Sequence, residues 1–279
     1  LDIVLREGVE LSEVNVVSRK LGTMKLRNSV MNEDMISSAE LTRAACCNLG
    51  ESFVTNPSVD VSYSDAATGA KQIKLLGLSG TYVQMMTENI PNFRGAAAPY
   101  GLGYVPGPWM QTIQVSKGSS SVKNGYESIT GQINVEFKKP QLPEADWVSA
   151  NLFASSTNRY EANADATVKL SKRWSTSLLA HYENETKSHD SNDDGFVDIP
   201  RVEQYNFWNR WAYMGYHYVF QAGIKALHET RNSGQTAHGQ TATHDLYEIG
   251  IQTNRYEAFT KNAYIFDKEK NTNLALILQ

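Results

Sequence analysis

Strict alternation of apolar and polar residues in the second half of the chain is the feature that most limits its fold. In one stretch Ala166, Val168 and Leu170 alternate with Asp165, Thr167 and Lys169. A period of two residues places these sets on opposite faces of a β-strand. Strands are predicted at 147–155, 164–171, 174–182, 204–213, 216–229, 246–266 and 272–279, with 246–266 as one long bulged strand. About seven strands are therefore expected.

Such strands fit either a soluble β-sandwich, as in a surface adhesin, or a transmembrane β-barrel. Charges within the strands, at Asp165, Lys169 and Lys225, favour a barrel with a polar interior. Tight connections at 172–173 and 214–215 alternate with long ones at 184–203 and 230–243, as in barrels. Aromatic residues near strand ends resemble the girdles at membrane interfaces: Trp147, Trp174, Tyr182, Tyr205 and Tyr216. We therefore predict that Val148, Ala150, Leu152 and Ala154 face lipid together with Ala166, Val168 and Leu170.

Composition narrows the class of protein further. The 279 residues carry a net charge of −4 with no basic cluster, which argues against a nucleic-acid binder. The sequence contains no run of 18 apolar residues, so no membrane-spanning helix is predicted. The sequence contains no P-loop, G-x-S-x-G, H-E-x-x-H or G-x-G-x-x-G motif, so we predict no enzyme. The adjacent Cys46 and Cys47 form no disulfide framework or zinc site and are interpreted as small filler residues.

The aromatic content divides the chain near Pro140. Residues 1–140 contain 9 Phe, Tyr and Trp residues, and residues 141–279 contain 19. In the first part a helix is predicted over 37–53, with Ser37 and Glu40 as a capping box. Leu41, Ala45, Leu49, Ser52 and Phe53 share one face of it. Because the sequence begins at Leu1 without Met and ends in a strand pattern, we expect a piece of a longer chain.

Four short strand-like segments separated by glycines follow the predicted helix. They are IKLLGL at 73–78, TYVQMMTENIP at 81–91, IQVSKGSSSVKNG at 113–125 and ITGQINVEFKKP at 129–140. In order and spacing they resemble the plug domain of TonB-dependent outer-membrane receptors. The sequence departs from the family pattern at Leu76, where Arg is usual, and at Glu88-Asn89, where Asp-Gly is usual. Tyr126 also follows Gly125, where the family has the reverse order.

The resemblance implies three parts. Residues 20–143 would be an α+β plug domain, and residues 144–279 the first antiparallel strands of a 22-stranded barrel in the outer membrane of a Gram-negative bacterium. Residues 1–19 would hold the end of a preceding domain and a TonB box like those of Bacteroidetes-like receptors. The box is the short extended segment Leu11, Ser12, Glu13, Val14, Asn15, Val16 and Val17, which could add a strand to periplasmic TonB. An ordinary strand is the alternative.

A receptor of this family imports a scarce nutrient with energy from TonB and performs no covalent chemistry. Because SVKNGYESITGQINVEFKK lacks the run typical of glycan importers, the resemblance points to an iron chelate, haem, cobalamin or another metal complex. The expected partners are TonB, this substrate and outer-membrane lipid, without nucleic acid and without a required cofactor. A TonB-dependent glycan importer and a β-rich surface adhesin remain alternatives.

The loop Asn92–Trp109 is rich in Gly, Pro and Ala and carries Phe93, Arg94, Tyr100, Tyr104 and Trp109. By the resemblance, such a loop faces the outside and contacts the substrate. Aromatic rings and an arginine suit a flat anionic chelate. The alternative is a loop packed against the barrel wall.

A possible metal site lies in the long connection after residue 184. Asp190, Asn192, Asp194 and Asp198, with the Phe196 carbonyl and Gly195 at the turn, fit a calcium-binding loop. Arg201 stands where a twelfth-position Glu is expected, so the predicted affinity is low. A solvated acidic loop is the alternative. Met85, Met86 and Met110 are interpreted as core filler, and the histidines are too scattered to define a site.

Overall fold

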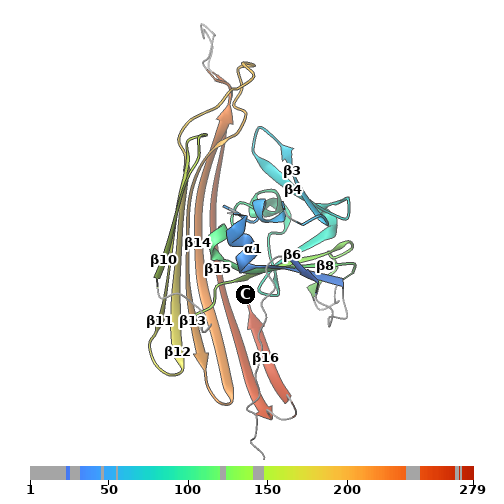
Figure 1. Cartoon of the computed structure of the whole chain (residues 1–279), viewed down its shortest axis with the longest axis vertical. Helices are drawn as coiled ribbons and strands as arrows, with labels where there is room; N and C mark the ends of the chain where they lie inside the picture. The colour runs from blue at the N-terminus through green and yellow to red at the C-terminus, as the bar shows by residue number, and fades with distance from the viewer. Residues whose placement is uncertain are drawn as a thin grey trace, which may run out of the picture.

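The computed structural model describes residues 23–25, 32–44, 47–54, 56–119, 124–140, 148–236, 246–267, 270 and 272–279. The predicted TonB box, Leu11–Val17, lies outside these residues, as does the predicted domain boundary between residues 143 and 144. The described residues form a plug, residues 23–140, that packs on one face of a tall antiparallel sheet, which we call the wall (Figure 1). None of the described helices is long and apolar enough to cross a membrane.

The plug is built around a six-stranded sheet with the order β1-β2-β8-β9-β6-β7. Neighbouring strands are antiparallel except β6 and β9, which are parallel. Ile113, Val115, Ile133 and Val135 are fully buried on one face, where β-branched side chains pack well. The strands are β1 Thr23–Lys25, β2 Asn32–Ser37, β6 Val83–Thr87, β7 Ile90–Pro91, β8 Met110–Lys117 and β9 Gly131–Phe137. The strand segments predicted after residue 72 are therefore confirmed.

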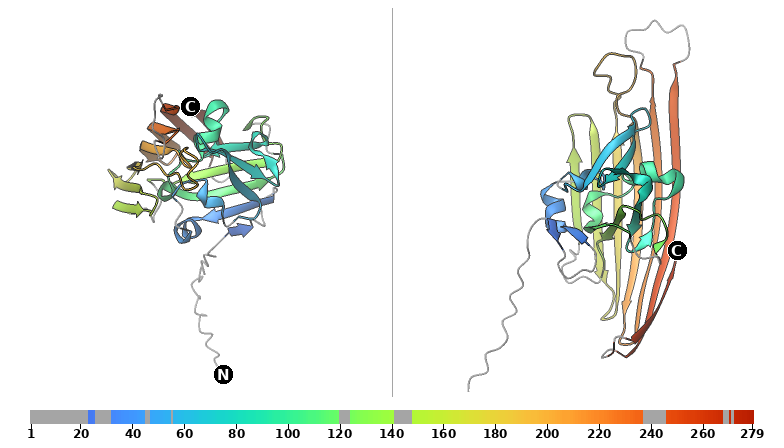
Figure 2. Two further views of the ribbon diagram at one scale, coloured as in Figure 1. Left: turned by 90° about the horizontal axis from the view of Figure 1, so that it is seen from above. Right: turned by 90° about the vertical axis from the view of Figure 1, so that its right-hand side faces the viewer.

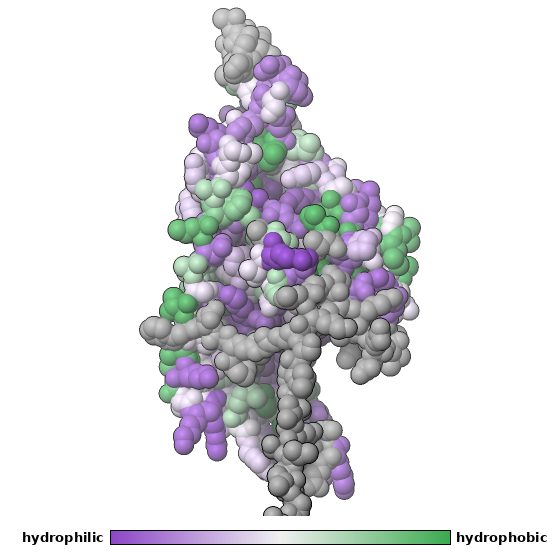
Figure 3. Space-filling view, in the orientation of Figure 1, coloured by the Kyte–Doolittle hydropathy of each residue, from purple (hydrophilic) through white to green (hydrophobic). Residues whose placement is uncertain are grey.

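A second, three-stranded sheet covers the plug core and reaches toward the end of the wall that carries the long connections (Figures 1 and 2). Hydrophilic residues gather on the surface at that end (Figure 3). It contains β3 Val59–Asp65, β4 Ala70–Leu75 and β5 Leu78–Ser79. Short helices complete the plug: α1 Ser38–Arg43, η1 Glu51–Phe53, η2 Gly80–Tyr82, η3 Gly95–Ala97, α2 Ala98–Gly101 and η4 Gly107–Trp109. The plug is thus a mixed α+β domain, as predicted.

The helix predicted over 37–53 is wrong in length. Among the described residues of this range only Ser38–Arg43 is α-helical, and Ser37 makes no capping hydrogen bond, so the capping box is also wrong. Leu49 N donates to Val105 O at 3.0 Å, because contact with another segment of the plug replaces the helical hydrogen bonds there. The apolar residues of the predicted face are nevertheless buried, with Leu41, Leu49 and Phe53 at 5%, 0% and 2% exposed.

The wall is a seven-stranded antiparallel sheet in which consecutive strands are neighbours. Its strands are β10 Val148–Ala154, β11 Arg159–Lys169, β12 Trp174–Glu185, β13 Arg201–Met214, β14 Tyr218–Gly234, β15 Glu248–Asp267 and β16 Thr272–Leu278. The predicted number of strands is confirmed, and β15 is one long strand with an irregular register between Ile265 and Asp267. β11, β12, β13 and β14 extend three to five residues beyond one end of the predicted ranges, because pairing continues past the strictly alternating stretches, whereas β10 and β16 are slightly shorter than predicted.

The two faces of the wall follow the predicted alternation. Asp165 points toward the plug, where Lys138 Nζ lies 2.8 Å from its Oδ1. On the opposite face Val148, Leu152, Val168 and Leu170 are 58%, 81%, 39% and 54% exposed. No second sheet covers that face in the part of the chain that the structure describes, which argues against the sandwich. We call the plug-bearing face the inner face and the other the outer face.

Aromatic side chains form two bands on the outer face. Near the tight turns, the ring of Trp174 lies 5.1 Å from Tyr213 and 6.1 Å from Phe220. Near the long connections, the rings of Tyr182 and Tyr205 lie 4.9 Å apart. Trp174 and Tyr182 are separated along β12 by about 26 Å, at roughly 3.3 Å per residue. At the roughly 40° tilt of barrel strands this separation corresponds to about 20 Å across the membrane, somewhat less than the apolar band of about 25 Å.

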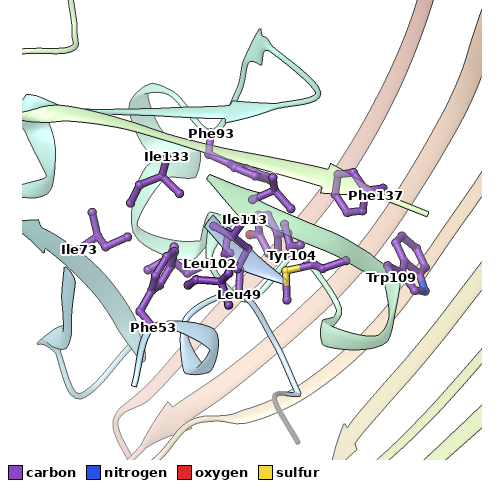
Figure 4. Close-up of a cluster of buried hydrophobic side chains, with 14 of the residues drawn as sticks. Leu49, Phe53, Ile73, Phe93, Leu102, Tyr104, Trp109, Ile113, Ile133 and Phe137 are labelled. Atoms are coloured by element: carbon purple, nitrogen blue, oxygen red, sulfur yellow. The ribbon is translucent and has the colours of Figure 1, made fainter. Parts of the chain in front are cut away.

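The hydrophobic core of the plug continues into the wall. Trp208, Leu179 and Leu227 of the wall belong to the same buried cluster as the plug residues. Figure 4 shows plug residues of this cluster, among them Trp109 and Phe137. The ring of Trp208 lies 4.5 Å from Phe137 in an edge-on arrangement and 6.3 Å from Trp109. A buried aromatic contact of this kind fixes the plug on the wall at the end of β9.

Candidate functional site

Glu88 and Arg210 form a buried ion pair between the plug and the wall. Arg210 Nη2 lies 2.5 Å from Glu88 Oε1, and the two side chains are 2% and 3% exposed. Arg210 Nη1 also donates to Lys138 O at 2.7 Å, and Lys261 Nζ donates to Glu88 O at 2.7 Å. The inner face therefore holds the plug both at the turn between β6 and β7 and at the end of β9.

Glu88 lies in a two-residue turn that favours smaller residues. Glu88 and Asn89 have φ angles of 52° and 62°, as in the type I′ turns that join antiparallel strands. Glutamate is unusual in this left-handed conformation, which Gly, Asn and Asp adopt more readily. The sequence prediction missed Glu88 as a functional residue. The available signals were its departure from the Asp-Gly pattern and the charged Arg210 in an apolar-alternating strand.

The wall also holds the loop Asn92–Trp109 through its backbone. Asn206 Nδ2 and Lys225 Nζ both donate to Tyr104 O, at 2.9 and 3.3 Å. Tyr104 OH donates to Thr253 Oγ1 at 3.4 Å. Burial raises the pKa of Tyr104 to about 12, so the hydroxyl stays protonated and able to donate. These contacts fix the middle of the loop on the inner face.

The five loop residues predicted to contact substrate fall into two groups. Phe93, Tyr104 and Trp109 are buried, at 4%, 1% and 0% exposed. Their burial favours packing against the wall over contact with a ligand. Arg94 has an exposed side chain and pairs with Glu127 at 2.7 Å, and Tyr100 is half-buried. Substrate contact by Arg94 and Tyr100 stays a prediction.

A cavity of about 180 Å³ opens between the plug and the wall, near the long connections. The plug contributes residues of β3, β4 and the Tyr100 region, and the wall contributes residues of β10 to β14. Two cations stack on plug rings there: Arg231 lies 5.2 Å from the Tyr100 ring, and Lys71 Nζ lies 5.3 Å from the Tyr63 ring. The cavity is therefore large enough for a small organic group, and both charged and aromatic side chains line it.

Arg159 forms a charged centre at the inner end of this cavity. Its guanidinium nitrogens lie 2.6 Å from Glu161, 2.9 Å from Glu183 and 3.1 Å from Glu51. Glu51 belongs to the plug and the other two glutamates to the wall, so Arg159 makes a further charged contact between the two parts. Each of its three nitrogens lies within salt-bridge distance of a different carboxylate.

The side chains of Met86, Met110 and Cys47, whose sulfur atoms could bind soft metal ions, are buried and pack against neighbouring residues. Met86 and Met110 are 0% and 3% exposed within the plug. Cys47 is buried, and burial raises the pKa of its thiol, so the unreactive protonated form is favoured. Among the described residues, no group of three His, Cys, Asp or Glu side chains is placed to hold a metal ion.

The predicted calcium loop connects β12 to β13. Asp190 accepts hydrogen bonds from Asp194 N at 3.1 Å and Gly195 N at 2.9 Å. Asp198 Oδ2 accepts from Ser191 N at 2.7 Å. The carboxylates thus order the loop through backbone N–H groups. Calcium binding by Asp190, Asn192, Asp194, Phe196 and Asp198 stays a prediction.

That prediction is tested by removing charge from single carboxylates in the full-length protein. Asp190→Asn and Asp194→Asn are each expected to remove one bound calcium per molecule, because carboxylates are the strongest ligands in such loops. Calcium stoichiometry would be measured by isothermal titration calorimetry. Asp193→Asn is the matched control, since Asp193 lies in the same loop outside the alternating ligand positions. Unchanged stoichiometry in the first two variants would leave the loop as a solvated turn.

Comparison with known proteins agrees with this architecture. Residues 25–132 match the family model of the TonB-dependent receptor plug domain. No curated protein matches the sequence. The FpvA receptor of P. aeruginosa in a pyoverdine–iron complex has a TM-score of 0.68 and 14% identity, over 88% of this chain and 33% of that chain. The copper transporter OprC has a TM-score of 0.66 and 14% identity, over 88% of this chain and 35% of that chain.

A third structure, the alcaligin outer-membrane receptor FauA of Bordetella pertussis, has a TM-score of 0.64 and 12% identity, over 90% of this chain and 38% of that chain. Identities this low show a shared fold. The chain spans about a third of the length of these structures. A plug seated on the inner face of antiparallel strands defines a plug-and-barrel protein. Residues 25–132 match the plug domain of TonB-dependent receptors, and the seven antiparallel strands that follow share the fold of the start of the barrel in these structures.

Proposed function

We propose that this chain is the plug and the first seven strands of an outer-membrane active transporter that imports a scarce nutrient with TonB-coupled energy. The proposed substrate is an iron chelate, haem, cobalamin or another metal complex. The observation that carries the proposal is a plug held on the inner face of the wall by the buried Glu88–Arg210 pair, with a polar cavity beside the long connections. No covalent chemistry is assigned to it.

The similar structures support a metal-containing substrate. FpvA is known in a complex with pyoverdine and iron, OprC is a copper transporter, and FauA is an alcaligin receptor. The exposed Arg94 and the half-buried Tyr100 of this chain suit an anionic chelate. In the proposed mechanism the substrate binds beside the long connections, and TonB acts on the N-terminal side of the plug from the periplasm.

Uptake measurements in cells test this function. Cells that produce the receptor are expected to accumulate radiolabelled iron from ferric chelates only when TonB and the proton gradient are intact. Binding of the same chelate to the cells should persist without TonB, because binding needs no energy. Uptake of oligosaccharides together with a co-purifying lipoprotein would instead support a glycan importer. Adhesion without any TonB-dependent uptake would support an adhesin.

The predicted TonB box provides a sharper test of energy coupling. Val14→Pro is expected to reduce uptake at least tenfold while chelate binding remains, because proline removes a backbone donor needed for strand addition. The matched control is Val14→Thr, which keeps a β-branched side chain and the backbone donor. Normal uptake in Val14→Pro would show that Leu11–Val17 is not the coupling segment.

A further inference from the structure

Two side chains of opposite charge face the cavity between the plug and the wall. Lys71 comes from β4 of the plug, and Glu185 comes from the end of β12 in the wall. Both are half-buried. Neither has an ion-pair partner among the residues that the structure describes, although other charged groups lie close by. A half-buried charge without a partner loses hydration without full compensation, so each of these groups would gain from a complementary ligand.

The neighbouring arginines form their ion pairs with other carboxylates. Glu185 is the cross-strand partner of Arg159, but the nitrogens of Arg159 lie 3.1, 2.6 and 2.9 Å from Glu51, Glu161 and Glu183. Arg231 Nε and Nη2 donate to Glu229 at 2.7 and 3.0 Å. Glu185 therefore remains an acceptor that faces the cavity.

Lys71 likewise has no carboxylate partner among the described residues. Its ammonium lies 5.3 Å from the Tyr63 ring, which is a weak partner compared with a carboxylate. Burial lowers the pKa of Lys71 despite the nearby Glu51. An anionic group placed in the cavity would favour the charged ammonium and bind to it.

We propose that this cavity binds a zwitterionic group, with its cationic nitrogen on Glu185 and its anionic oxygen on Lys71. The inference rests on the proposed function, since the group would be part of the imported compound, such as an amino-acid unit of a metal chelate. The rings of Tyr63, Tyr100 and Phe153 line the same cavity and would cover the carbon skeleton of the ligand. Because Lys71 belongs to the plug and Glu185 to the wall, the ligand bridges the two parts.

The experiment uses the purified whole receptor and three small probes. L-leucine carries both charges, N-acetyl-L-leucine only the negative charge, and L-leucinamide only the positive charge. Binding would be measured by ligand-observed NMR over millimolar concentrations. L-leucine is expected to bind about tenfold more tightly than either single-charge probe, since each charge-assisted hydrogen bond contributes about one order of magnitude in affinity. Equal binding of all three probes would overturn the proposal.

Two variants test which side chain binds each charged end of L-leucine. Lys71→Met should weaken L-leucine about tenfold and leave L-leucinamide unchanged, whereas Glu185→Gln should weaken L-leucine and leave N-acetyl-L-leucine unchanged. Glu203→Gln is the matched control, because Glu203 is an exposed carboxylate at the same end of the wall, on β13. The assignment would be contradicted if Glu203→Gln lost binding of L-leucine, or if Glu185→Gln bound L-leucine as tightly as the unchanged protein.

The outcome is distinguishable from that of the proposed function. If TonB-dependent iron uptake holds but the zwitterionic probe shows no preference, the cavity assignment fails and the transporter assignment stands. If L-leucine binds as expected but no TonB-dependent uptake of a metal complex is found, the cavity is a ligand site and the proposed transport function fails.

Discussion

Replacing Arg210 with methionine is expected to lower the free energy of unfolding of the plug in the whole receptor by about 3–5 kcal/mol. The change leaves the carboxylate of Glu88, only 3% exposed, with Lys261 at 3.5 Å as its remaining charged neighbour. Removing one partner of a buried pair costs more than removing both, because the second charge stays without compensation. Adding Glu88→Gln to Arg210→Met should therefore recover most of the loss.

The measurement is urea unfolding of the purified receptor followed by tryptophan fluorescence. Trp109 of the plug and Trp208 of the wall lie 6.3 Å apart, so their emission reports separation of the two parts. Arg201→Met is the control, since Arg201 is an exposed arginine on the same strand, and its loss should change stability by less than about 0.5 kcal/mol. A double variant as unstable as Arg210→Met alone would show that pairing with Glu88 is not what Arg210 contributes.

The wall was predictable from sequence because its signal is local. Alternation at 164–171 assigned Asp165 to the plug side, and the Lys138–Asp165 contact at 2.8 Å confirms that side. Residues 246–266 lack a Gly or Pro turn in the middle, and β15 is indeed one strand. In both cases the deciding information lies within one strand: alternating residues occupy opposite faces, and a turn needs its own residues.

The anchoring of the plug was not predictable because it depends on partners distant in sequence. In sequence the aromatic residues of the loop look like ligand contacts: Phe93, Tyr104 and Trp109. In the structure they instead contact Trp208 and Lys225 of the wall. Glu88 anchors the plug because it pairs with Arg210, and no sequence motif links these two positions. The helix over 37–53 failed for the same reason. Its apolar spacing is real, but Leu49 bonds to Val105, a contact that no local pattern reveals.

Placing an arginine at Ala166 is expected to be the most damaging single change on the outer face. Ala166 pairs with Val148 and Leu178 in the outer row, and Leu178 lies midway between Trp174 and Tyr182 of the two aromatic bands. An arginine at the middle of the lipid-facing band of a barrel costs about 2–4 kcal/mol, because its charge leaves water for hydrocarbon. Folding stability would be measured by urea titration of the whole receptor in phosphatidylcholine vesicles, with SDS gel mobility reporting the folded fraction.

Two companion variants separate charge from size and one face from the other. Ala166→Leu adds bulk without charge and is expected to be neutral or slightly stabilising, since the added carbons contact lipid. Thr167→Arg places the same arginine one residue along the strand, on the inner face with Asp165, where water and polar plug groups can solvate it. Its cost should stay well below that of Ala166→Arg. If the two arginine variants were equally stable, or Thr167→Arg the less stable one, the lipid-facing register would be reversed or the outer face would not meet lipid at all.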